Sequence, residues 1–552
     1  MWFWGDDSWE HQPGWEERQH PGTLFAVYAF LDEVLGVKWP YPGDADTVLP
    51  KKKRFKLQDG WRLKYCPPLL MSIVRNRGAL QRKPTGQYVR YIAKSADPKA
   101  PPELRMTTDD FDLNGRLYGQ WLLRNRNYSR VRFEYGHAFN DWQNRFLKKH
   151  PDWFGYDPVT RSRRTDTGGR GLVDQRAGSA KLCLSNPEVR EQILRDWKEK
   201  GAPEWYNICP NDGTPGYCRC DNCMKLDERK EGETFYATLT DRYLWFWNRI
   251  LDSAVEVRPD VKFVTYIYSY YRQPSRRERI EYPDNLIAGM VPSIADDHET
   301  YFSEWQKRGL KRFFLRPNFL SYGMAFYRGH ERLIYDCFQI ARRYGAIGMD
   351  MSGGGGDCRQ KDIESYVTAR VIAYPEMTFD EICDEFYSQY GAASNAVRTV
   401  REQIRVSGED AVNRLIRNNS DIRAGLKRIL DDSMLGKYAV MGNTEKALRQ
   451  YVGILRTARS ELENRLSAVE RRRLDNEIIR FEHSLLSFRF REVGQCKTAN
   501  LNELVGIAKK LHDFRVANKE AIGRQFDGTY GLYGKKGGEA EIWKRAMPSV
   551  FK

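Results

Sequence analysis

The stretch EWYNICPNDGTPGYCRCDNC, residues 204–223, decides the fold and carries the densest chemistry of the chain. Its apolar run Trp205–Cys209 stops at Pro210 and gives way to Asn211 and Asp212, which is how a buried strand ends in a polar loop. In a parallel α/β fold, such loops lie at the end of the sheet where active sites are built. We therefore take Asp212 as the centre of a candidate site.

Outward from this stretch, residues 61–375 alternate between short apolar runs and longer helical patterns. The expected strands are 69–74, 131–135, 205–209, 262–268, 286–291, 312–315 and 347–351. The expected helices cover about 110–124, 186–200, 233–258, 300–308, 330–344 and 361–373. Repeated strand and helix units over this length predict an α/β fold with a TIM-like (β/α) barrel, although the count stops one strand short of eight.

The two ends of the chain differ from this central part. Residues 1–60 predict a partial N-terminal α/β domain and linker, with a helix at 22–35, short strands at 2–4 and 37–39, and several prolines after them. Residues 376–552 predict a helical domain, because long periodic segments follow one another with almost no proline. Its expected helices are 379–390, 395–416, 420–432, 444–465, 467–492 and 500–519.

Composition and charge exclude several classes of protein. The net charge is +16, but the 90 Lys and Arg residues are interleaved with 74 Asp and Glu residues, and the basic runs 51–54 and 471–473 are short. This pattern is typical of a solvated surface, so we expect no nucleic-acid partner. No stretch reaches 18 uninterrupted apolar residues, and the start of the chain lacks the features of a signal peptide. We expect no membrane span.

Polar side chains gather directly after the expected strands. They are Glu134 and His137, Asn211 and Asp212, Tyr268 to Tyr271, Asp296 to His298, Asn318, and Asp350. Any one of them alone is explained as a strand-end cap or a turn residue. Because a barrel exposes these ends on one face, their convergence predicts a shared site.

Four cysteines cluster around the same loop. Cys209, Cys218, Cys220 and Cys223 leave three interpretations open: four thiolate ligands of a structural zinc ion, a disulfide within the group, or free thiols. A zinc ion with four sulfur ligands has no open position for water, so it would be structural. The remaining cysteines are dispersed and are explained as buried thiols: Cys66, Cys183, Cys337, Cys358, Cys383 and Cys496.

Four blocks of sequence carry a resemblance to a known family. They are GTLFAVYAFLDEVLGVKW at 22–39, FEYGHAFNDWQNRFLKKHPDWFGYD at 133–157, KLCLSNPEVREQILRDW at 181–197, and the stretch from CPNDG to CRCDNC; EFYSQYGAAS at 385–394 fits as well. Together they resemble the bacterial proteins grouped as domain of unknown function 4838, associated with glycoside hydrolase family 163. The glycine-rich segment 349–357 departs from the family pattern and leaves the substrate preference open.

The resemblance implies an endo-β-N-acetylglucosaminidase that cuts N-glycans with retention through the 2-acetamido group of the substrate, and it suggests export from the cell. Such chemistry needs two acids: one protonates the leaving oxygen, and the other orients the acetamido group. We expect Asp212 and Glu134 to be this catalytic pair, with Asp212 on the acetamido group and His137, Asn211, Tyr268 and Asp350 as substrate-binding residues. No cofactor is required for this reaction.

Two alternatives stay open at this point. One is an exo-acting hydrolase of uronic acids or related sugars, for which the surplus of basic residues is useful. The other is a carbohydrate-binding protein without catalysis, which needs aromatic rings and hydroxyl contacts but no pair of acids. A nucleic-acid-binding zinc knuckle is disfavoured, because Asp221, Asp227 and Glu228 lie beside the cysteines where basic residues are needed.

Overall fold

The computed structural model describes residues 3–10, 18–50, 54–75, 108–129, 134–159, 161–163, 181–212, 216–235, 238–294, 296–320, 326–352, 362–417, 444–496, 500–523 and 540–547. The chain divides into two compact units. Unit 1 comprises Met1–Tyr128, Asn318–Asp336 and Met351–Lys552, and unit 2 comprises Ser129–Pro317 and Cys337–Asp350. The three domains expected from the sequence, 1–60, 61–375 and 376–552, stay a prediction.

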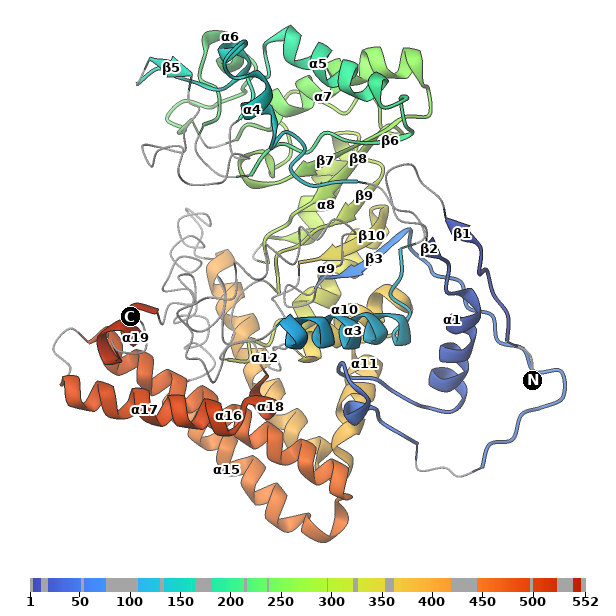
Figure 1. Cartoon of the computed structure of the whole chain (residues 1–552), viewed down its shortest axis with the longest axis vertical. Coiled ribbons are helices and arrows are strands. Elements are labelled where there is room, and N and C mark those ends of the chain that lie inside the picture. Colours follow the sequence, from blue (N-terminus) through green and yellow to red (C-terminus); the bar gives the residue numbers. More distant parts are fainter. Residues whose placement is uncertain are drawn as a thin grey trace. The chain divides into compact units, whose positions relative to one another are not determined.

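A parallel sheet forms the core of unit 2 (Figure 1). Its strands are β6 (Trp205–Asn207), β7 (Lys262–Ile267), β8 (Leu286–Met290), β9 (Phe313–Leu315) and β10 (Ala346–Met351), and each of them pairs in parallel with the next. The full strand order is β3-β10-β9-β8-β7-β6, where β3 is Met71–Val74. The prediction of an α/β fold is confirmed, in the form of a curled parallel sheet. Six strands are described in it, and a closed barrel stays a prediction.

The strands β7 and β8 of this sheet are apolar and buried on both faces. All five residues of β8 are buried, as are five of the six residues of β7. Gly289 in β8 is held to its size, since a Cβ there would lie 2.6 Å from the ring of Phe314. Six of the seven expected strands are observed within a few residues. Of the remaining one, 131–133 lie outside the described residues, and Glu134 and Tyr135 are not in a strand.

Unit 2 also contains helices. They are α4 (Trp142–Phe146), α5 (Pro187–Glu199), α6 (Asp221–Met224), α7 (Thr240–Val257) and α8 (His298–Lys307); α9 (Glu331–Arg343) has residues in both units. Asn186 caps α5 by accepting from the backbone N–H of Glu188, and Pro187 occupies the first turn. Trp197 of α5 packs edge-on against Phe263 of β7, and Phe302 of α8 stacks on Phe313 of β9. A short antiparallel pair, β4 (Tyr156–Asp157) with β5 (Ser162–Arg163), precedes α5 in the sequence.

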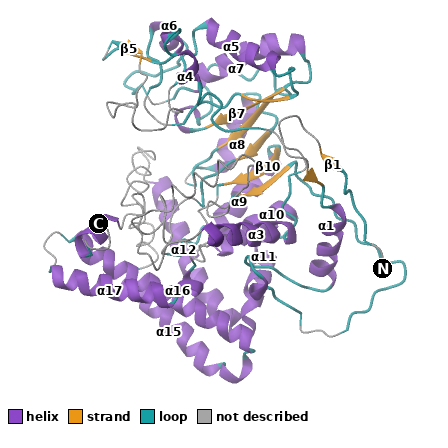
Figure 2. Ribbon diagram, in the orientation of Figure 1, coloured by secondary structure: helices purple, strands orange, loops and turns teal. Residues whose placement is uncertain are grey.

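Unit 1 is mostly helical (Figure 2). Its elements include the pair β1 (Trp9–Glu10) and β2 (Arg18–Gln19), and the helices α1 (Gly22–Ala29, continued to Val34), α3 (Thr108–Arg124), α10 (Asp362–Ala373), α11 (Phe379–Tyr387), α12 (Ser394–Arg417), α15 (Glu445–Glu461), α16 (Ala468–Gln495), α17 (Leu501–Ala517), α18 (Lys519–Ile522) and α19 (Ala540–Ala546). Capping boxes start α11 at Thr378 and α16 at Ser467. The expected helices agree with these bounds, except that 420–432 lies outside the described residues. In unit 2, the expected helix 233–258 begins only at Thr240. Of the expected strand 2–4, Trp2 lies outside the described residues, and Phe3 and Trp4 are not in a strand.

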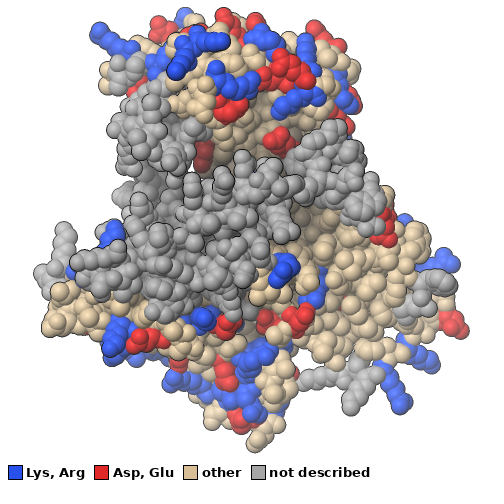
Figure 3. Space-filling view, viewed as in Figure 1, with Lys and Arg blue, Asp and Glu red and all other residues tan. Residues whose placement is uncertain are grey.

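Charged residues of both signs are interspersed on the face of the molecule drawn in Figure 3. This agrees with the solvated surface expected from the sequence. Among the described residues, no helix combines the length and the apolar character that a membrane crossing requires.

Candidate active site

The candidate site begins where β6 ends. The residues after this strand, from Ile208 to Asn211, are buried, and the chain then turns outward so that the side chain of Asp212 is 60% exposed. A carboxylate of this kind stays hydrated and remains available to a ligand. The structure places Asp212 just after the C-terminal end of β6, the last strand in the described order, and the sequence predicted this position after a strand.

The segment 136–139 runs alongside the residues that follow β6. The side-chain amide of Asn207 donates to the carbonyl oxygen of Gly136 at 2.8 Å, and the backbone N–H of Ala138 donates to that of Cys209 at 3.0 Å. Gly136 has a φ of +120°, which only glycine adopts readily, so the chain can bend there. These contacts bring His137 to the loop that carries Asp212.

Asn211 fixes this arrangement. Its Oδ1 accepts from the backbone N–H of Phe139 at 3.1 Å, and its Nδ2 donates to the carbonyl oxygen of the same residue at 2.9 Å. The residue is 4% exposed. Asn211 as a substrate contact stays a prediction, although in this structure both ends of its amide are paired with the Phe139 backbone. Asn211 braces the loop.

His137 connects the brace to Asp212. Its Nδ1 lies 2.8 Å from the carbonyl oxygen of Pro210, and since a carbonyl oxygen only accepts, Nδ1 carries a hydrogen. The opposite nitrogen, Nε2, lies 3.9 Å from Oδ2 of Asp212. A neutral His137 thus presents an acceptor toward Asp212, and a protonated His137 forms an ion pair with it. The imidazole and the carboxylate are close enough to bind one polar group together.

Lys181 holds the backbone of the loop that carries Asp212, a role that the sequence did not indicate. Its ammonium group donates to the carbonyl oxygen of Asn211 and lies 4.8 Å from the centre of the Tyr217 ring. Burial lowers the pKa of Lys181 to about 8, although the nearby Asp212 carboxylate acts in the opposite direction. The signal was hidden because a single lysine at the start of an apolar segment has no distinctive spacing.

Aromatic side chains surround His137. The ring of Tyr266, in β7, lies 5.7 Å from the ring of His137, 6.1 Å from that of Tyr135 and 6.4 Å from that of Tyr268. Tyr268 is half-buried and is followed by Ser269, whose φ of 55° is unusual for a residue other than glycine. Tyr268 therefore lies at a strand end where the backbone is strained, as is common next to functional groups.

Glu134 is exposed and lies near β6. Burial raises the pKa of the Cys209 thiol, and the charge of Glu134 adds to that rise. Burial likewise raises the pKa of Tyr206, with smaller contributions from Asp196 and Glu134. Glu134 lies two residues before Gly136, whose carbonyl oxygen accepts from Asn207 of β6, so it is in the same part of unit 2 as Asp212. Its pairing with Asp212 in one pocket stays a prediction.

The other acids expected at strand ends have structural partners. Asp350 is fully buried in β10, with its Oδ2 3.6 Å from Nε of Arg316, so it is not open to a ligand in this structure. Asp296 forms an ion pair with Arg272, and Asp297 caps α8 by accepting from the backbone N–H of Thr300. The burial of Asp350 therefore does not support the expectation that it binds a sugar.

The cysteine group differs from the expected one by one member. The Sγ atoms of Cys183, Cys218, Cys220 and Cys223 all lie within 4.8 Å of one another, and among the described residues these side chains form the group able to hold a metal ion. Cys209 is not in it, because its thiol is directed at the carbonyl oxygen of Val264, 3.7 Å away. The expectation of Cys209 as a ligand is wrong, since it belongs to the core around β6 and β7.

The geometry of this site can now be set beside known proteins. No curated protein matches the chain. A solved structure of a mutant of Thermobaculum terrenum O-GlcNAc hydrolase aligns over 67% of this chain and 76% of its own, with 14% sequence identity and a TM-score of 0.27. The family model described as "Domain of unknown function (DUF4838)" matches residues 81–402, more than half of the 552 residues. The chain therefore belongs to the DUF4838 family.

Proposed function

We propose that this protein is a glycoside hydrolase that acts on glycans containing N-acetylglucosamine, as an endo-β-N-acetylglucosaminidase with substrate-assisted retention. The observation that carries the proposal is the exposed carboxylate of Asp212, 3.9 Å from Nε2 of His137, on a loop braced by buried groups. The resemblance of four sequence blocks to family 163 of the glycoside hydrolases gives the substrate class.

Asp212 has the surroundings that the second acid of this mechanism needs. The carboxylate must orient the 2-acetamido group while the oxygen of that group attacks the anomeric carbon, and it must stay ionised to accept the amide hydrogen. Asp212 is 60% exposed, so its carboxylate is open to a ligand. Asn211 holds the backbone of this loop, and the two hydrogen bonds by which it does so go to Phe139 and not to the Asp212 carboxylate.

Glu134 is the proposed general acid, which protonates the leaving oxygen. It is exposed near β6, and Tyr135 follows it directly in the aromatic group around His137. The half-buried ring of Tyr268 suits the apolar face of a pyranose, and its hydroxyl group suits the polar edge. An enzyme, unlike a carbohydrate-binding protein, needs both acids at one glycosidic oxygen.

A product analysis tests the proposal. The full chain is incubated with a panel of N-glycans and aryl N-acetylglucosaminides, and products are read by mass spectrometry. We expect cleavage within the N-glycan, and a loss on the order of a hundredfold in turnover for Asp212→Asn, as is typical when a positioned acid is removed. Asp260→Asn is the matched control, since Asp260 is an exposed aspartate that precedes β7 at the opposite end of the strands.

The outcomes separate the alternatives. Release of single terminal sugars, above all uronic acids, favours the exo-acting hydrolase. Binding of glycans without any cleavage favours the carbohydrate-binding protein. Substrate assistance has its own test: replacing the acetamido group of an aryl substrate by fluorinated acetamido groups weakens its oxygen as a nucleophile, so turnover falls with each fluorine. A turnover rate that does not change with the number of fluorine atoms contradicts the assisted mechanism.

A further inference from the structure

We propose that Cys183, Cys218, Cys220 and Cys223 bind a zinc ion through four thiolates, and that this ion is a structural staple for the loop that carries Asp212. This proposal does not depend on the reaction proposed above. It rests on the geometry of the four sulfur atoms, on the segments that they join and on the hydrogen-bond donors around them.

The distances between the sulfur atoms fit a tetrahedral ion. Sγ of Cys183 lies 3.6 Å from that of Cys218, 3.7 Å from that of Cys220 and 3.8 Å from that of Cys223. Zinc–sulfur bonds of about 2.3 Å in a regular tetrahedron place the sulfurs about 3.8 Å apart. A disulfide requires about 2.05 Å, so Cys183 is bonded to none of the other three, and all four thiols are free in this structure. Two packed thiols also touch at about this distance, so the case for an ion rests on four sulfurs that meet at one point.

The four cysteines come from two separate segments. Three lie within six residues, where Cys220 precedes the short helix α6 and Cys223 lies inside it. Cys183 comes from the segment before α5, and its backbone N–H donates to the carbonyl oxygen of Trp153 at 2.7 Å. A spacing of 34 residues between the first and the second ligand hides the set in the sequence. A metal ion at this point would tie the two segments together.

Donors around the sulfurs suit four thiolates, which leave a zinc site with two negative charges. The backbone N–H of Tyr156 donates to Sγ of Cys218 at 3.4 Å, and Nη1 of Arg163 lies 3.9 Å from the same sulfur. The hydroxyl of Ser185 lies 3.6 Å from Sγ of Cys220, where either atom can donate. Such outer contacts orient metal ligands and stabilise their charge. Four sulfurs select zinc or iron, and with no open position the ion has no water to activate.

The site is connected to the loop of Asp212 by its neighbours. Lys181, two residues before Cys183, donates to the carbonyl oxygen of Asn211, and the backbone N–H of Gly155 donates to that of Lys181 at 2.8 Å. On the other side, Nη1 of the buried Arg242 donates to the carbonyl oxygen of Cys218 at 2.7 Å. A zinc ion at this site would therefore hold the segment of Lys181 and Cys183 and the segment that begins at Cys218, on either side of the Asp212 loop.

Metal content of the purified full chain tests the site. Zinc alone is supplied during expression, and metals are measured by mass spectrometry together with protein concentration. We expect one zinc per chain in the parent and in Cys209→Ala, the matched control for a buried cysteine outside the group, and a loss of zinc in Cys183→Ala. Zinc retained by Cys183→Ala, or lost from Cys209→Ala, overturns the assignment, as does iron in place of zinc.

Two measurements on the parent chain keep the test decisive if Cys183→Ala does not fold. Exchange of the ion for cobalt should give the intense absorption of tetrahedral cobalt with four thiolates. Thiol labelling of the native chain should show Cys183, Cys218, Cys220 and Cys223 protected until a chelator is added. Labelling of these four without a chelator, or a disulfide peptide joining any two of them, overturns the proposal.

Discussion

Two aspartates, one in each unit, show how differently the same side chain is used. Asp32 in unit 1 is 1% exposed and forms ion pairs with Lys38, Arg126 and Arg370. Asp212 in unit 2 is 60% exposed and faces His137 across 3.9 Å. The carboxylate of Asp32 is fully paired within the fold, whereas the carboxylate of Asp212 is open to a ligand.

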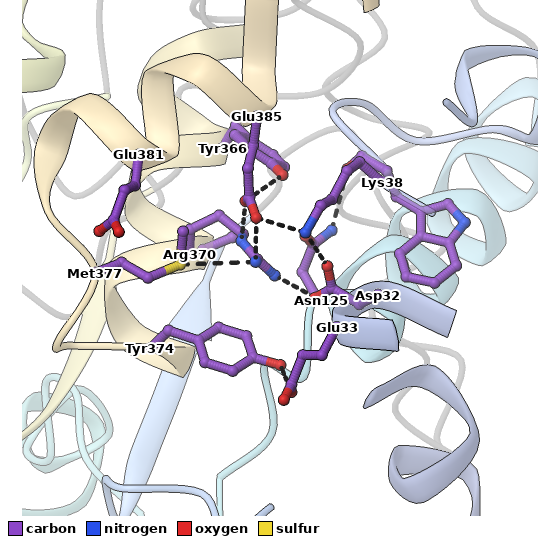
Figure 4. Close-up of polar contacts among 12 residues, drawn as sticks. Asp32, Glu33, Lys38, Asn125, Tyr366, Arg370, Tyr374, Met377, Glu381 and Glu385 are labelled. Atoms are coloured by element: carbon purple, nitrogen blue, oxygen red, sulfur yellow. Dashed lines mark hydrogen bonds and ion pairs between the residues drawn. The ribbon is translucent and has the colours of Figure 1, made fainter. Parts of the chain in front are cut away.

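The Asp32 network shows what a structural carboxylate requires (Figure 4). Burial acts to raise the pKa of Asp32, but Arg370, Arg126 and Lys38 outweigh it and hold the pKa well below its usual range. Glu385 accepts from Arg370 and from Lys38, so the cations are shared. A buried acid surrounded in this way carries no implication for chemistry, although its strongly perturbed pKa resembles that of a catalytic group.

The largest effect is expected from Asp32→Asn. Removal of this charge leaves Arg126 and Arg370 buried without their main partner, which typically costs about 3–5 kcal/mol of unfolding free energy. Urea denaturation measures it. The control is Asp44→Asn, whose exposed ion pair with Arg124 should matter little. Equal midpoints for the two variants contradict the division between a structural and an open aspartate.

The second prediction concerns Glu134→Gln. If Glu134 is the general acid, turnover of N-glycans falls on the order of a hundredfold, because the leaving oxygen is no longer protonated. An aryl glycoside with a good leaving group should lose roughly tenfold or less, because it scarcely needs a proton. Steady-state kinetics on both substrates measure the difference. Asp212→Asn is the comparison, since it should slow both substrates alike; the same pattern in both variants contradicts the two roles.

The third prediction uses the titration of Lys181. Its pKa is lowered from 10.5 to about 8, so the folded chain binds fewer protons than the unfolded chain between these values. The cost of the buried ammonium is fully present below pH 8 and disappears as pH rises toward 10.5. Stability gained by the parent over Lys181→Met should therefore rise from pH 7.5 to 9.5, by up to about 1.4 kcal/mol per pH unit.

Urea midpoints of both chains across this range check the prediction, and tyrosines that titrate at high pH affect the two chains alike. Lys181→Arg is the control for the hydrogen bond to Asn211, because arginine keeps a donor and stays charged. A difference between the parent and Lys181→Met that does not change with pH contradicts the role of burial at Lys181.

Much of the fold followed from the sequence because its strands obey a local rule. Buried parallel strands need apolar runs that stop at turn residues, and β8 and the run before Pro210 show both features. The helix bounds followed for the same reason, as in α5, where Asn186 and Pro187 mark the start. Closure of the barrel stays a prediction, because it depends on pairing between strands far apart in the chain.

Only part of the candidate site could be predicted from the sequence. The position of Asp212 after a strand is a local property, and the structure agrees with it. The brace by Asn211, the support by Lys181 and the fourth cysteine, Cys183, are contacts between segments tens of residues apart, which no spacing reveals. Cys209 misled because it is near the other cysteines in sequence, while its thiol belongs to the core.

The smallest expected effect concerns Ser269, where the backbone of unit 2 is strained beside Tyr268. Its φ of 55° costs about 1–2 kcal/mol for a residue with a Cβ. On one side β7 fixes the chain, and on the other Tyr271 is fully buried and stacks on Tyr243 at 4.1 Å. The strain is thus imposed by packing and sets the direction of the Tyr268 ring.

Ser269→Gly relieves this strain but adds freedom to the unfolded chain, so the net gain in stability should be about 0–1 kcal/mol. If the strained turn positions Tyr268 for a sugar, the same change should lower turnover a few-fold. Ala202→Gly is the matched control, since Ala202 has a φ of 48° after α5, outside the site residues. It should gain similar stability with unchanged turnover. Denaturation midpoints and turnover, measured together, check both variants. Full activity in Ser269→Gly would mean that the strain at this strand end belongs to the fold alone, as the charge of Asp32 does.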